Sequence, residues 1–430
     1  MTPARVSPYR EHIEELRRSL LQSGSLALLL IDVSQLGQVE HDYGSGAFEK
    51  VLSSAAELIG ELRGNEVRGN DILTLNERGG DAFLLFLSPR RYGASNHVAD
   101  LQAAAGRVED RLNRKLARLT SPYLRGQQHV NVGFSLVFFN PLVMPERLLA
   151  RLVEEAWECV RVQKMQRQFQ NRCRLQDILL EGQIRVVFQP VVDLRQGATL
   201  GYEALARGPV GSTHHMPANL FEIASEADMV FELDRCCRQR ALAAARDLPR
   251  GAKLFVNVFP ACMYDPEFQG VKLIQMLEGL GLSPERIVLE INERYAIENY
   301  TLFVEALQNL TQMGFEIAVD DIGAGYSGLE KIANLNPRYL KLDMQLVKDI
   351  DGSYIRREMA RAVKSFADKM EATVIAEGIE SEDELRALID LGITWGQGYL
   401  LGRPADGFGA SLAAAPRVPP RPLEAPPPGA

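Results

Sequence analysis

The chain has 430 residues, of which 46% are hydrophobic and 24% are charged, and its formal net charge is −8 at pH 7. These values are typical of a soluble globular protein with two or three domains. The negative charge argues against a general nucleic-acid or membrane-surface binder, and no apolar run reaches the roughly 18 residues of a membrane span. The five cysteines lack metal-ligand spacing, so we expect reduced thiols in a cytoplasmic protein.

The first part of the chain predicts a helix followed by an α+β domain. Residues 1–24 are expected to form a charged helix with Ile13, Leu16, Leu20 and Leu21 on one face. Residues 25–165 then follow the order βαββαβα, which is typical of an antiparallel sheet with helices on one face, a ferredoxin-like arrangement. The expected elements before the last helix are Leu26–Val33, Ala47–Leu62, a hairpin over Asp71–Leu87, Val98–Leu119 and Val130–Phe139.

The helical pattern that starts near Glu146 continues past the end of this domain. We therefore expect residues 166–180 to be a helical linker. Residues 181–408 alternate strand and helix, which predicts a (β/α)₈ barrel, a fold of about 250 residues. Residues 409–430 are rich in Pro and Ala and are expected to be disordered.

The eight predicted barrel strands share an unusual feature. Each is a short apolar run, as a strand buried on both faces requires, yet each carries a polar residue at or near its end. Burying an unpaired charge is costly, so this repetition predicts a ring of polar groups at one end of the barrel. In chain order the ring comprises Gln189, Glu203, Asn257, Glu290, Asp320 with Asp321, Lys341, Glu377 and Gln397.

The ring is rich in oxygen donors. Glu203, Asn257, Glu290, Asp320 and Asp321 offer only oxygen, which favours Mg²⁺ or Mn²⁺ over Zn²⁺. Adjacent aspartates at a strand end are able to reach two ions, and paired ions are used to hydrolyse phosphodiesters.

Other polar residues suit the remaining steps of such a reaction. Lys341 is a candidate for orienting water, Glu377 for accepting its proton, and Arg207 for binding a phosphate. Gly323, with Gly325 and Gly328, predicts a loop able to close over substrate. The structural alternative is that each carboxylate is a helix cap or surface ion pair, but the repetition at equivalent strand ends favours chemistry or ligand binding.

These residues resemble the EAL-domain cyclic-di-GMP phosphodiesterases. Tyr202-Glu203-Ala204-Leu205-Ala206-Arg207 matches the E-A-L-x-R motif. Further matches occur in order at Gln189-Pro190, Asn257, Glu290-Ile291-Asn292-Glu293, Asp320-Asp321-Ile322-Gly323, Lys341-Leu342-Asp343, Glu377-Gly378-Ile379-Glu380 and Gln397-Gly398-Tyr399. The resemblance covers about residues 175–405. It implies a barrel with one antiparallel strand, two Mg²⁺ or Mn²⁺ ions, and hydrolysis of cyclic-di-GMP to linear pGpG.

The resemblance also implies a role for each residue of the ring. Glu203, Asn257, Glu290 and Asp320 would ligate one ion, and Asp320 and Asp321 the other. Lys341 and Glu377 would position and deprotonate water, and Gln397 would hold metal-bound water. Glu380 would support the loop after Asp321, and Gln189, Leu205 and Arg207 would contact the dinucleotide.

Three positions depart from the family pattern, and none is an expected metal ligand. Phe259 replaces a serine, Asn292 a threonine, and Ile322 the phenylalanine of the D-D-F-G loop. Ile322 is expected to loosen loop closure and lower the rate. The other reading is a catalytically weak cyclic-di-GMP receptor. The complete set of expected ligands and bases favours the enzyme.

Residues 25–165 resemble a GGDEF diguanylate cyclase domain that has lost its chemistry. Arg78-Gly79-Gly80-Asp81-Ala82-Phe83 stands at the signature hairpin with Ala82 in place of the glutamate, and Asp32 keeps one metal position while Ser34 replaces the other aspartate. Leu36-Gly37, Glu40 and His41 also depart from the family, so we expect no synthesis.

Two further properties of this domain remain open. Arg68-Gly69-Asn70-Asp71 resembles the inhibitory RxxD motif that binds cyclic-di-GMP, but an ordinary surface turn explains it equally well. GTP binding by this domain is left open, and the resemblance implies a homodimer.

Overall fold

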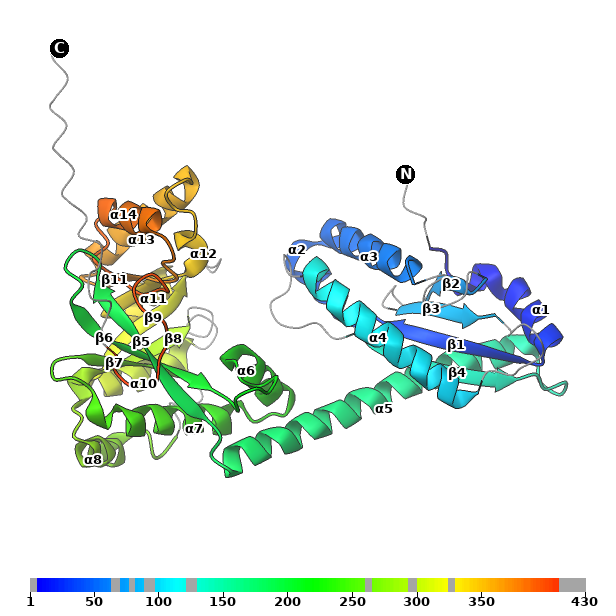
Figure 1. Cartoon of the computed structure of the whole chain (residues 1–430), viewed down its shortest axis with the longest axis horizontal. Helices are drawn as coiled ribbons and strands as arrows, with labels where there is room; N and C mark the ends of the chain where they lie inside the picture. Colours follow the sequence, from blue (N-terminus) through cyan, green and yellow to red (C-terminus); the bar gives the residue numbers. More distant parts are fainter. Residues whose placement is uncertain are drawn as a thin grey trace, which may run out of the picture. The chain divides into compact units, whose positions relative to one another are not determined.

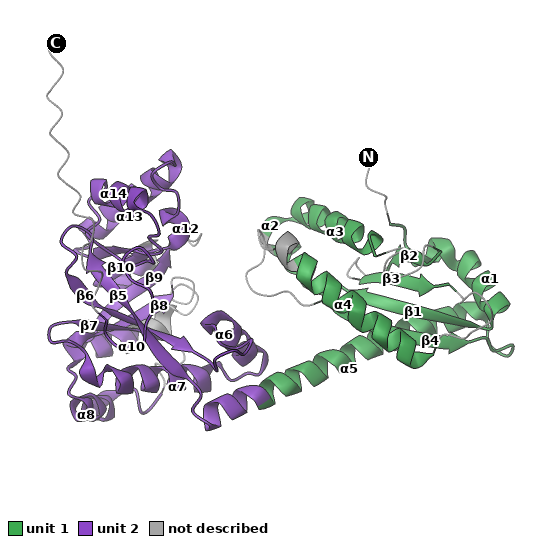
Figure 2. Cartoon of the chain, in the orientation of Figure 1, with its two compact units in different colours: residues 1–173 green, residues 174–430 purple. Residues whose placement is uncertain are grey.

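The computed structural model describes residues 6–62, 70–76, 82–88, 97–120, 130–259, 265–292, 300–323 and 329–409. The chain divides into two compact units, residues 1–173 and 174–430, each with its own apolar cores (Figure 2). The boundary falls inside helix α5 (Pro145–Leu180), which is continuous through residues 166–180. Among the described residues, no helix is both long and apolar enough to cross a membrane.

Unit 1 is an α+β domain built on a four-stranded sheet (Figure 1). The strand order is β2-β3-β1-β4, and every neighbouring pair is antiparallel. Its elements are η1 (Tyr9–His12), α1 (Ile13–Ser23), β1 (Ser25–Asp32), η2 (Ser34–Leu36), α2 (Gly37–Tyr43), α3 (Ser45–Gly60), β2 (Ile72–Leu75), β3 (Ala82–Leu87), α4 (Val98–Thr120), β4 (Asn131–Phe138) and the first part of α5. The predicted element order is therefore confirmed.

Helices cover both faces of this sheet, so the prediction of helices on one face was wrong. Leu29 and Ile31 of β1 pack with the buried residues of α3 and α4, whereas Leu28 and Leu30 pack with those of α1 and α5. Successive side chains of a strand point to opposite faces. Because β1 is apolar at every position from Leu26 to Ile31, both of its faces require cover.

Helix α1 is shorter than the predicted helix over 1–24. It begins at Ile13 and ends at Ser23, before Gly24, whose φ of 72° closes the helix in the left-handed conformation that glycine adopts without strain. Leu16 and Leu20 are fully buried, but Leu21 is 45% exposed. Of the four residues predicted to share one helix face, Leu21 therefore lies at its solvent-exposed edge.

Unit 2 is a closed eight-stranded barrel surrounded by helices (Figure 1). The strands close in the order β10-β11-β12-β5-β6-β7-β8-β9, and of these described barrel strands β5 alone runs antiparallel to both neighbours. The barrel strands are β5 (Arg185–Asp193), β6 (Thr199–Arg207), β7 (Lys253–Asn257), β8 (Ile287–Asn292), β9 (Glu316–Ile322), β10 (Tyr339–Leu342), β11 (Thr373–Ala376) and β12 (Trp395–Gly396). The barrel with one antiparallel strand is thus confirmed.

The helices of unit 2 follow the strands in sequence. They are α6 (Pro217–Glu226), α7 (Val230–Ala244), η3 (Ala245–Asp247), α8 (Gly270–Leu280), η5 (Pro284–Arg286), α10 (Tyr300–Gln312), α11 (Leu329–Leu335), α12 (Met344–Val347), α13 (Tyr354–Lys369) and α14 (Glu382–Asp390). The buried residues of α8, α10, α11, α12, α13 and α14 pack with outward-facing strand residues in one large apolar cluster, whereas those of α6 pack in a separate cluster with the end of α5.

The barrel interior explains where the polar ring lies. A separate apolar cluster fills the interior, and it includes Phe255, Val288, Ala318, Tyr339 and Ile375. Side chains two positions apart on a strand share a face, so the next inward residue on each strand comes two positions later. Those residues are Asn257, Glu290, Asp320, Lys341 and Glu377. The interior is therefore apolar in one layer and polar in the next.

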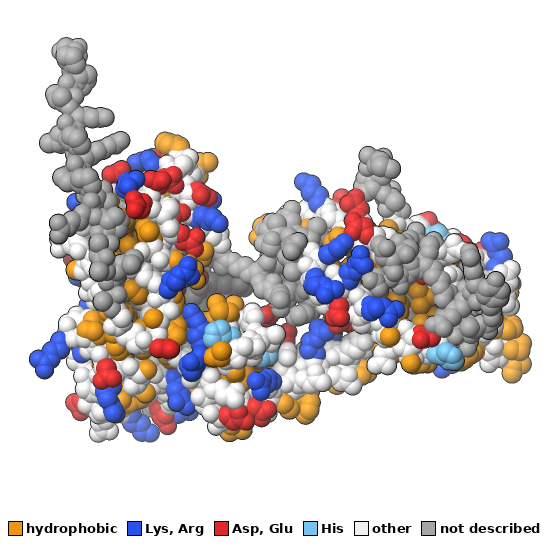
Figure 3. Space-filling view, viewed as in Figure 1, with side chains coloured by type: hydrophobic (Ala, Val, Ile, Leu, Met, Phe, Trp, Pro, Cys, Tyr) orange, Lys and Arg blue, Asp and Glu red, His pale blue; other side chains and the backbone are white. Residues whose placement is uncertain are grey.

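Surface charge differs from place to place. Acidic and basic side chains are interspersed over the face of the barrel unit seen in Figure 3, whereas Lys and Arg side chains gather over α4 in unit 1. Arg107, Arg111, Arg114 and Lys115 line a shallow hollow there together with Asp110.

Candidate active site

Lys341 lies at the centre of the polar ring. Its side chain is 1% exposed, and its Nζ atom is surrounded by carboxylates from three strands and the residue after β11. Nζ lies 2.6 Å from Glu377 Oε1, 2.8 Å from Glu290 Oε1, 3.3 Å from Glu203 Oε2 and 3.5 Å from Asp320 Oδ1. Burial lowers the pKa of Lys341, but the four carboxylates outweigh this effect and raise it well above its usual value. One ammonium group thus faces four carboxylates.

Glu203 is the best supported carboxylate in the ring. Asn257 Nδ2 donates to its Oε1 at 3.0 Å, and Gln397 Nε2 donates to its Oε2 at 2.5 Å. Burial raises the pKa of Glu203, but Lys341 and these two amide donors together bring it below its ordinary value. Glu203 is therefore held as an anion with fixed orientation.

The other three carboxylates are held less favourably. Burial raises the pKa of Glu290 well above its ordinary value, and the neighbouring Glu203 and Asp320 add to the effect. Burial likewise raises the pKa of Asp320 and of Glu377, against the opposing charge of Lys341. Among the described residues, neither oxygen of Glu290 nor Gln397 Oε1 receives a well-directed hydrogen bond, although all three atoms are buried. Lys341 Nζ is the cationic group beside Glu290 Oε1, and buried acceptors with so few donors favour a bound cation.

Asp320 and Asp321 lie near the end of β9, and the backbone of Asp321 is constrained. Asp321 has a φ of 61°, which is uncommon for a non-glycine residue. The Asp321 N–H donates to Asp320 Oδ1 at 3.0 Å, and Asn292 Nδ2 donates to Asp321 Oδ2 at 2.5 Å. Oxygen atoms of Asp320, Asp321 and Glu377 all lie within 4.8 Å of one another. The oxygen-only donor set therefore fits hard divalent cations.

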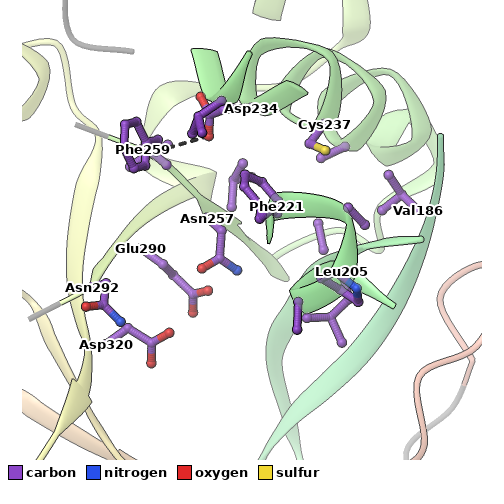
Figure 4. Close-up of a pocket in the computed structure, with 18 of the residues that line it drawn as sticks. Val186, Leu205, Phe221, Asp234, Cys237, Asn257, Phe259, Glu290, Asn292 and Asp320 are labelled. Carbon is purple, nitrogen blue, oxygen red and sulfur yellow. Dashed lines mark hydrogen bonds between the residues drawn. The ribbon is translucent and has the colours of Figure 1, made fainter. Parts of the chain in front are cut away.

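A cavity of about 550 Å³ opens beside these carboxylates (Figure 4). Asn257, Glu290 and Asp320 extend into it from three successive strands, β7, β8 and β9. Its opposite wall is largely apolar and includes Leu205, Phe221 and residues of α6 and α7. The volume is within the usual range for small-molecule sites, about 300 to 1,000 Å³.

The residues expected to contact substrate occupy different positions. Leu205 lines the cavity. Gln189 is buried opposite Glu203 in the β5–β6 register, and its Nε2 donates to the Gly402 carbonyl at 3.0 Å. Arg207, at the end of β6, is half-buried and its Nη1 donates to the Ala206 carbonyl at 2.8 Å.

Glu380 is exposed, and its backbone N–H donates to Glu384 Oε2 at 2.9 Å. Its expected partner, the loop over residues 324–328 with Gly325 and Gly328, lies outside the described residues.

Gly323 has a φ of 100°, and a Cβ there would collide with Leu346. Gly378 has a φ of 69°, and a Cβ there would collide with Met344. A glycine is therefore needed directly after Glu377.

The three residues that depart from the family pattern have definite surroundings. Asn292 supports Asp321, as described above. Phe259 lines the cavity, and its N–H donates to Asp234 Oδ1 at 3.0 Å. Ile322 is 2% exposed within the large apolar cluster of the barrel.

One group of residues beside the cavity was not predicted from the sequence. Asp234 lines it and forms an ion pair with Arg238, which also reaches Asp265. The available signal was the spacing of Asp234 and Arg238, which places them on one face of a helix. That spacing usually marks a surface pair, yet both side chains are almost completely buried.

In unit 1, the buried acidic residue Asp32 ends β1. Its side chain is 1% exposed, its Oδ2 lies 2.6 Å from Lys164 Nζ of α5, and its Oδ1 accepts the Ser34 N–H at 2.9 Å. Ala82 lies directly opposite Asp32 in the β1–β3 pair. Residues 78–81 and Arg68-Gly69 lie outside the described part of the chain. No site comparable to the barrel ring is formed by the described residues around Asp32.

Residues 172–404, more than half of the chain, match the family model of the EAL domain. The chain belongs to the EAL domain family. The EAL domain of FimX from Pseudomonas aeruginosa, solved bound to c-di-GMP, is similar in structure with a TM-score of 0.50 and 25% sequence identity. That similarity covers 55% of this chain and 96% of the FimX domain.

Curated relatives extend the comparison. The uncharacterized protein y4lL of Sinorhizobium fredii is 26% identical over 418 residues, which cover 92% of this chain and 48% of y4lL. The probable cyclic di-GMP phosphodiesterase PdeI of Escherichia coli is 31% identical over 230 residues, which cover 52% of this chain and 29% of PdeI. The chain thus spans half or less of the length of these relatives.

Proposed function

We propose that the barrel is a phosphodiesterase that hydrolyses cyclic-di-GMP to linear pGpG with two Mg²⁺ or Mn²⁺ ions. The observation that carries the proposal is the placement of four carboxylates within 3.5 Å of Lys341 Nζ. Four carboxylates against one ammonium leave an excess of negative charge that divalent cations would neutralise. The match of the family model and the name of PdeI support this choice of substrate.

The proposed roles follow from the donors in the ring. Glu203, Asn257, Glu290 and Asp320 would hold one cation, and Asp320 with Asp321 the other. When bound, the pair would polarise the phosphodiester and lower the pKa of the attacking water. Oxygen atoms of Asp320, Asp321 and Glu377 lie within 4.8 Å of one another, which supports a second cation position beside Glu377.

Glu377 would take the proton of the attacking water. Its Oε1 lies 2.6 Å from Lys341 Nζ, so the lysine orients the carboxylate. Hydrolysis adds one water across one phosphodiester bond and leaves a 5′-phosphate and a 3′-hydroxyl, which gives pGpG. Gln189, Leu205 and Arg207 would contact the dinucleotide, Gln397 would hold metal-bound water, and Glu380 would support the loop after Asp321.

The direct test is incubation of the purified protein with cyclic-di-GMP and either Mg²⁺ or Mn²⁺, followed by chromatographic detection of pGpG. We expect product with the wild-type protein and none above background with Glu203→Ala. A folded wild-type protein that binds cyclic-di-GMP tightly without forming pGpG would instead establish the weak receptor.

We further propose that residues 25–165 are a degenerate GGDEF domain with a regulatory or dimerising role, joined through residues 166–180 to the catalytic barrel at 181–408. Ala82, Ser34 and Lys164 at the end of the sheet support the absence of synthesis. The protein would act as a cytoplasmic homodimer, and GTP binding by this domain would be regulatory.

A further inference from the structure

Arg238 on α7 is the largest fully buried side chain of the described residues. Its Nε donates to Asp234 Oδ2 at 2.7 Å, and its Nη2 donates to Asp265 Oδ2 at 3.2 Å. The guanidinium carbon lies 4.3 Å from the centroid of the Phe268 ring. Burying a guanidinium group is costly unless charged or hydrogen-bonding partners surround it. The two aspartates and the Phe268 ring are these partners for Arg238.

One of these contacts leads directly to the catalytic cavity. Asp234 lines the cavity, and its other oxygen, Oδ1, accepts the Phe259 N–H at 3.0 Å (Figure 4). Phe259 follows β7 two residues after Asn257, whose Nδ2 donates to Glu203 Oε1 at 3.0 Å. Arg238 is therefore connected through Asp234 and one backbone hydrogen bond to the end of the strand that carries Asn257.

The second contact of Arg238 is with Asp265. Asp265 is 1% exposed, and its Oδ1 accepts the Glu267 N–H at 3.0 Å. Arg238 thus contacts Asp265 directly and reaches the Phe259 N–H through Asp234.

We infer that Arg238 is a positioning residue for the end of β7. It orients Asp234, which fixes the backbone at Phe259 and thereby the direction of the Asn257 side chain. The inference rests on the proposed function in assigning Asn257 to a cation. Residues that orient metal ligands contribute about 10- to 100-fold to metal affinity.

Arg235 supplies a matched control on the same helix. Its Nε lies 3.5 Å from Asp265 Oδ2, and its Nη2 pairs with Glu267. Its side chain is 34% exposed. Arg235→Met therefore removes the second arginine of the buried Asp265 and leaves the ion pair between Arg238 and Asp234 in place.

The first experiment is hydrogen–deuterium exchange of the metal-free full-length protein. We expect the Phe259 amide to exchange about tenfold faster in Arg238→Met, because its acceptor loses orientation. Arg238→Lys keeps the positive charge and reaches one carboxylate, so this variant should fold even where Arg238→Met does not. Its Phe259 amide should exchange at an intermediate rate. Arg235→Met should match the wild type.

The second experiment is Mn²⁺ binding, measured from the signal of free Mn²⁺ in electron paramagnetic resonance. We expect the affinity to fall about 10-fold in folded Arg238→Met, less in Arg238→Lys, and not in Arg235→Met. Folded Arg238 variants with wild-type exchange at Phe259 and wild-type Mn²⁺ affinity would overturn the inference and leave Arg238 a structural residue.

These measurements also separate the inference from the proposed function. A wild-type protein that forms no pGpG would refute the hydrolysis, while the exchange at Phe259 would still support or overturn the role of Arg238. If the wild type binds no Mn²⁺, the assignment of Asn257 fails, and the inferred role fails with it.

Discussion

Unit 1 and the barrel each contain a buried acidic residue at the end of a strand with a lysine beside it, but the two sites differ in what surrounds the lysine. Among the described residues, the ion-pair partner of Asp32 is Lys164, whereas Lys341 is shared by Glu203, Glu290, Asp320 and Glu377. One lysine is enough to compensate one carboxylate. In the barrel one lysine faces four carboxylates and leaves most of their negative charge uncompensated. A cation would bind to this excess negative charge.

The architecture of each unit explains the difference. A closed barrel directs the inward side chains of several strands to one axis, so carboxylates from β6, β8 and β9 meet at Lys341. An open four-stranded sheet has no such axis. In unit 1 the residue facing Asp32 across the β1–β3 pair is Ala82. Convergence of strands, more than the presence of aspartate, therefore distinguishes a candidate catalytic centre from a structural ion pair.

The largest expected effect tests whether the excess acidic groups of the barrel do chemistry. Glu377→Gln preserves the size of the side chain but cannot accept a proton, so kcat should fall by about 10²- to 10⁴-fold. The measurement is the initial rate of pGpG formation at saturating Mn²⁺. Glu382→Gln is the control, since Glu382 is an exposed α14 residue that pairs with Arg386. Equal rates for the two variants would remove Glu377 from the role of base.

The second prediction concerns protons held by the crowded carboxylates. Burial, with the neighbouring carboxylates, raises the pKa of Glu290, Asp320 and Glu377, so the metal-free site retains protons above the usual titration range of such groups. Cation binding needs the ionised forms and should release these protons. Mn²⁺ affinity should therefore weaken as pH falls, by about tenfold per pH unit for each proton released.

Calorimetric titration in two buffers of different ionisation enthalpy measures this release. Glu290→Gln removes one proton-binding group, so the number of protons released should fall. Binding heats that do not depend on the buffer would show that the metal-free carboxylates are already ionised.

The sequence predicted the barrel and its ring for a simple physical reason. A polar residue in a strand buried on both faces is costly. Its repetition at one strand end after another therefore predicted Glu290, Asp320 and Lys341 as site residues from the sequence. The buried group of Asp234, Arg238 and Asp265 could not be predicted in this way. It forms only when α7 packs beside the end of β7, and the spacing of Asp234 and Arg238 alone cannot distinguish burial from exposure.

In unit 1, too, the strand was predictable from the sequence whereas the ion pair was not. The apolar run of β1 predicted a buried strand and, since it has no polar alternation, contained the signal for helices on both faces. The pairing of Asp32 with Lys164 joins residues far apart in the chain and depends on the register of α5 along the sheet. Local pattern therefore predicts elements and their inward positions, whereas ion pairs between elements need the assembled fold.

The third prediction adds a carboxylate to unit 1. Ala82→Glu restores the glutamate of the GGDEF motif, but Ala82 is fully buried beside Leu28 and Leu30 and lies opposite Asp32. Like charges directly opposite one another in a sheet are unfavourable, and a buried polar group without a partner costs about 1 to 3 kcal/mol. We expect a loss of stability of this size and no synthesis of cyclic-di-GMP from GTP.

Unfolding of unit 1 is followed in urea through Trp157 fluorescence in a Trp395→Phe background, since these are the two tryptophans of the chain. Ala82→Gln is the uncharged control and should be destabilised less. Cyclase activity in Ala82→Glu would contradict the assignment of a degenerate domain.

The smallest expected effect concerns Lys164 and tests whether the simpler acidic site binds a cation once its lysine is removed. Lys164→Met leaves Asp32 with the Ser34 N–H, and since Lys164 is 39% exposed, solvent already screens the lost pair. The expected loss of stability is about 1 kcal/mol, against about 0.3 to 0.5 kcal/mol for Arg151→Met, which breaks the exposed pair with Glu155.

Because Mg²⁺ requires several well-placed oxygen ligands, Mg²⁺ should not restore the unfolding midpoint of Lys164→Met. A Mg²⁺-dependent rise in that midpoint, absent from Arg151→Met, would mean that Lys164 occupies a genuine cation position and that the two acidic sites differ in degree rather than in kind.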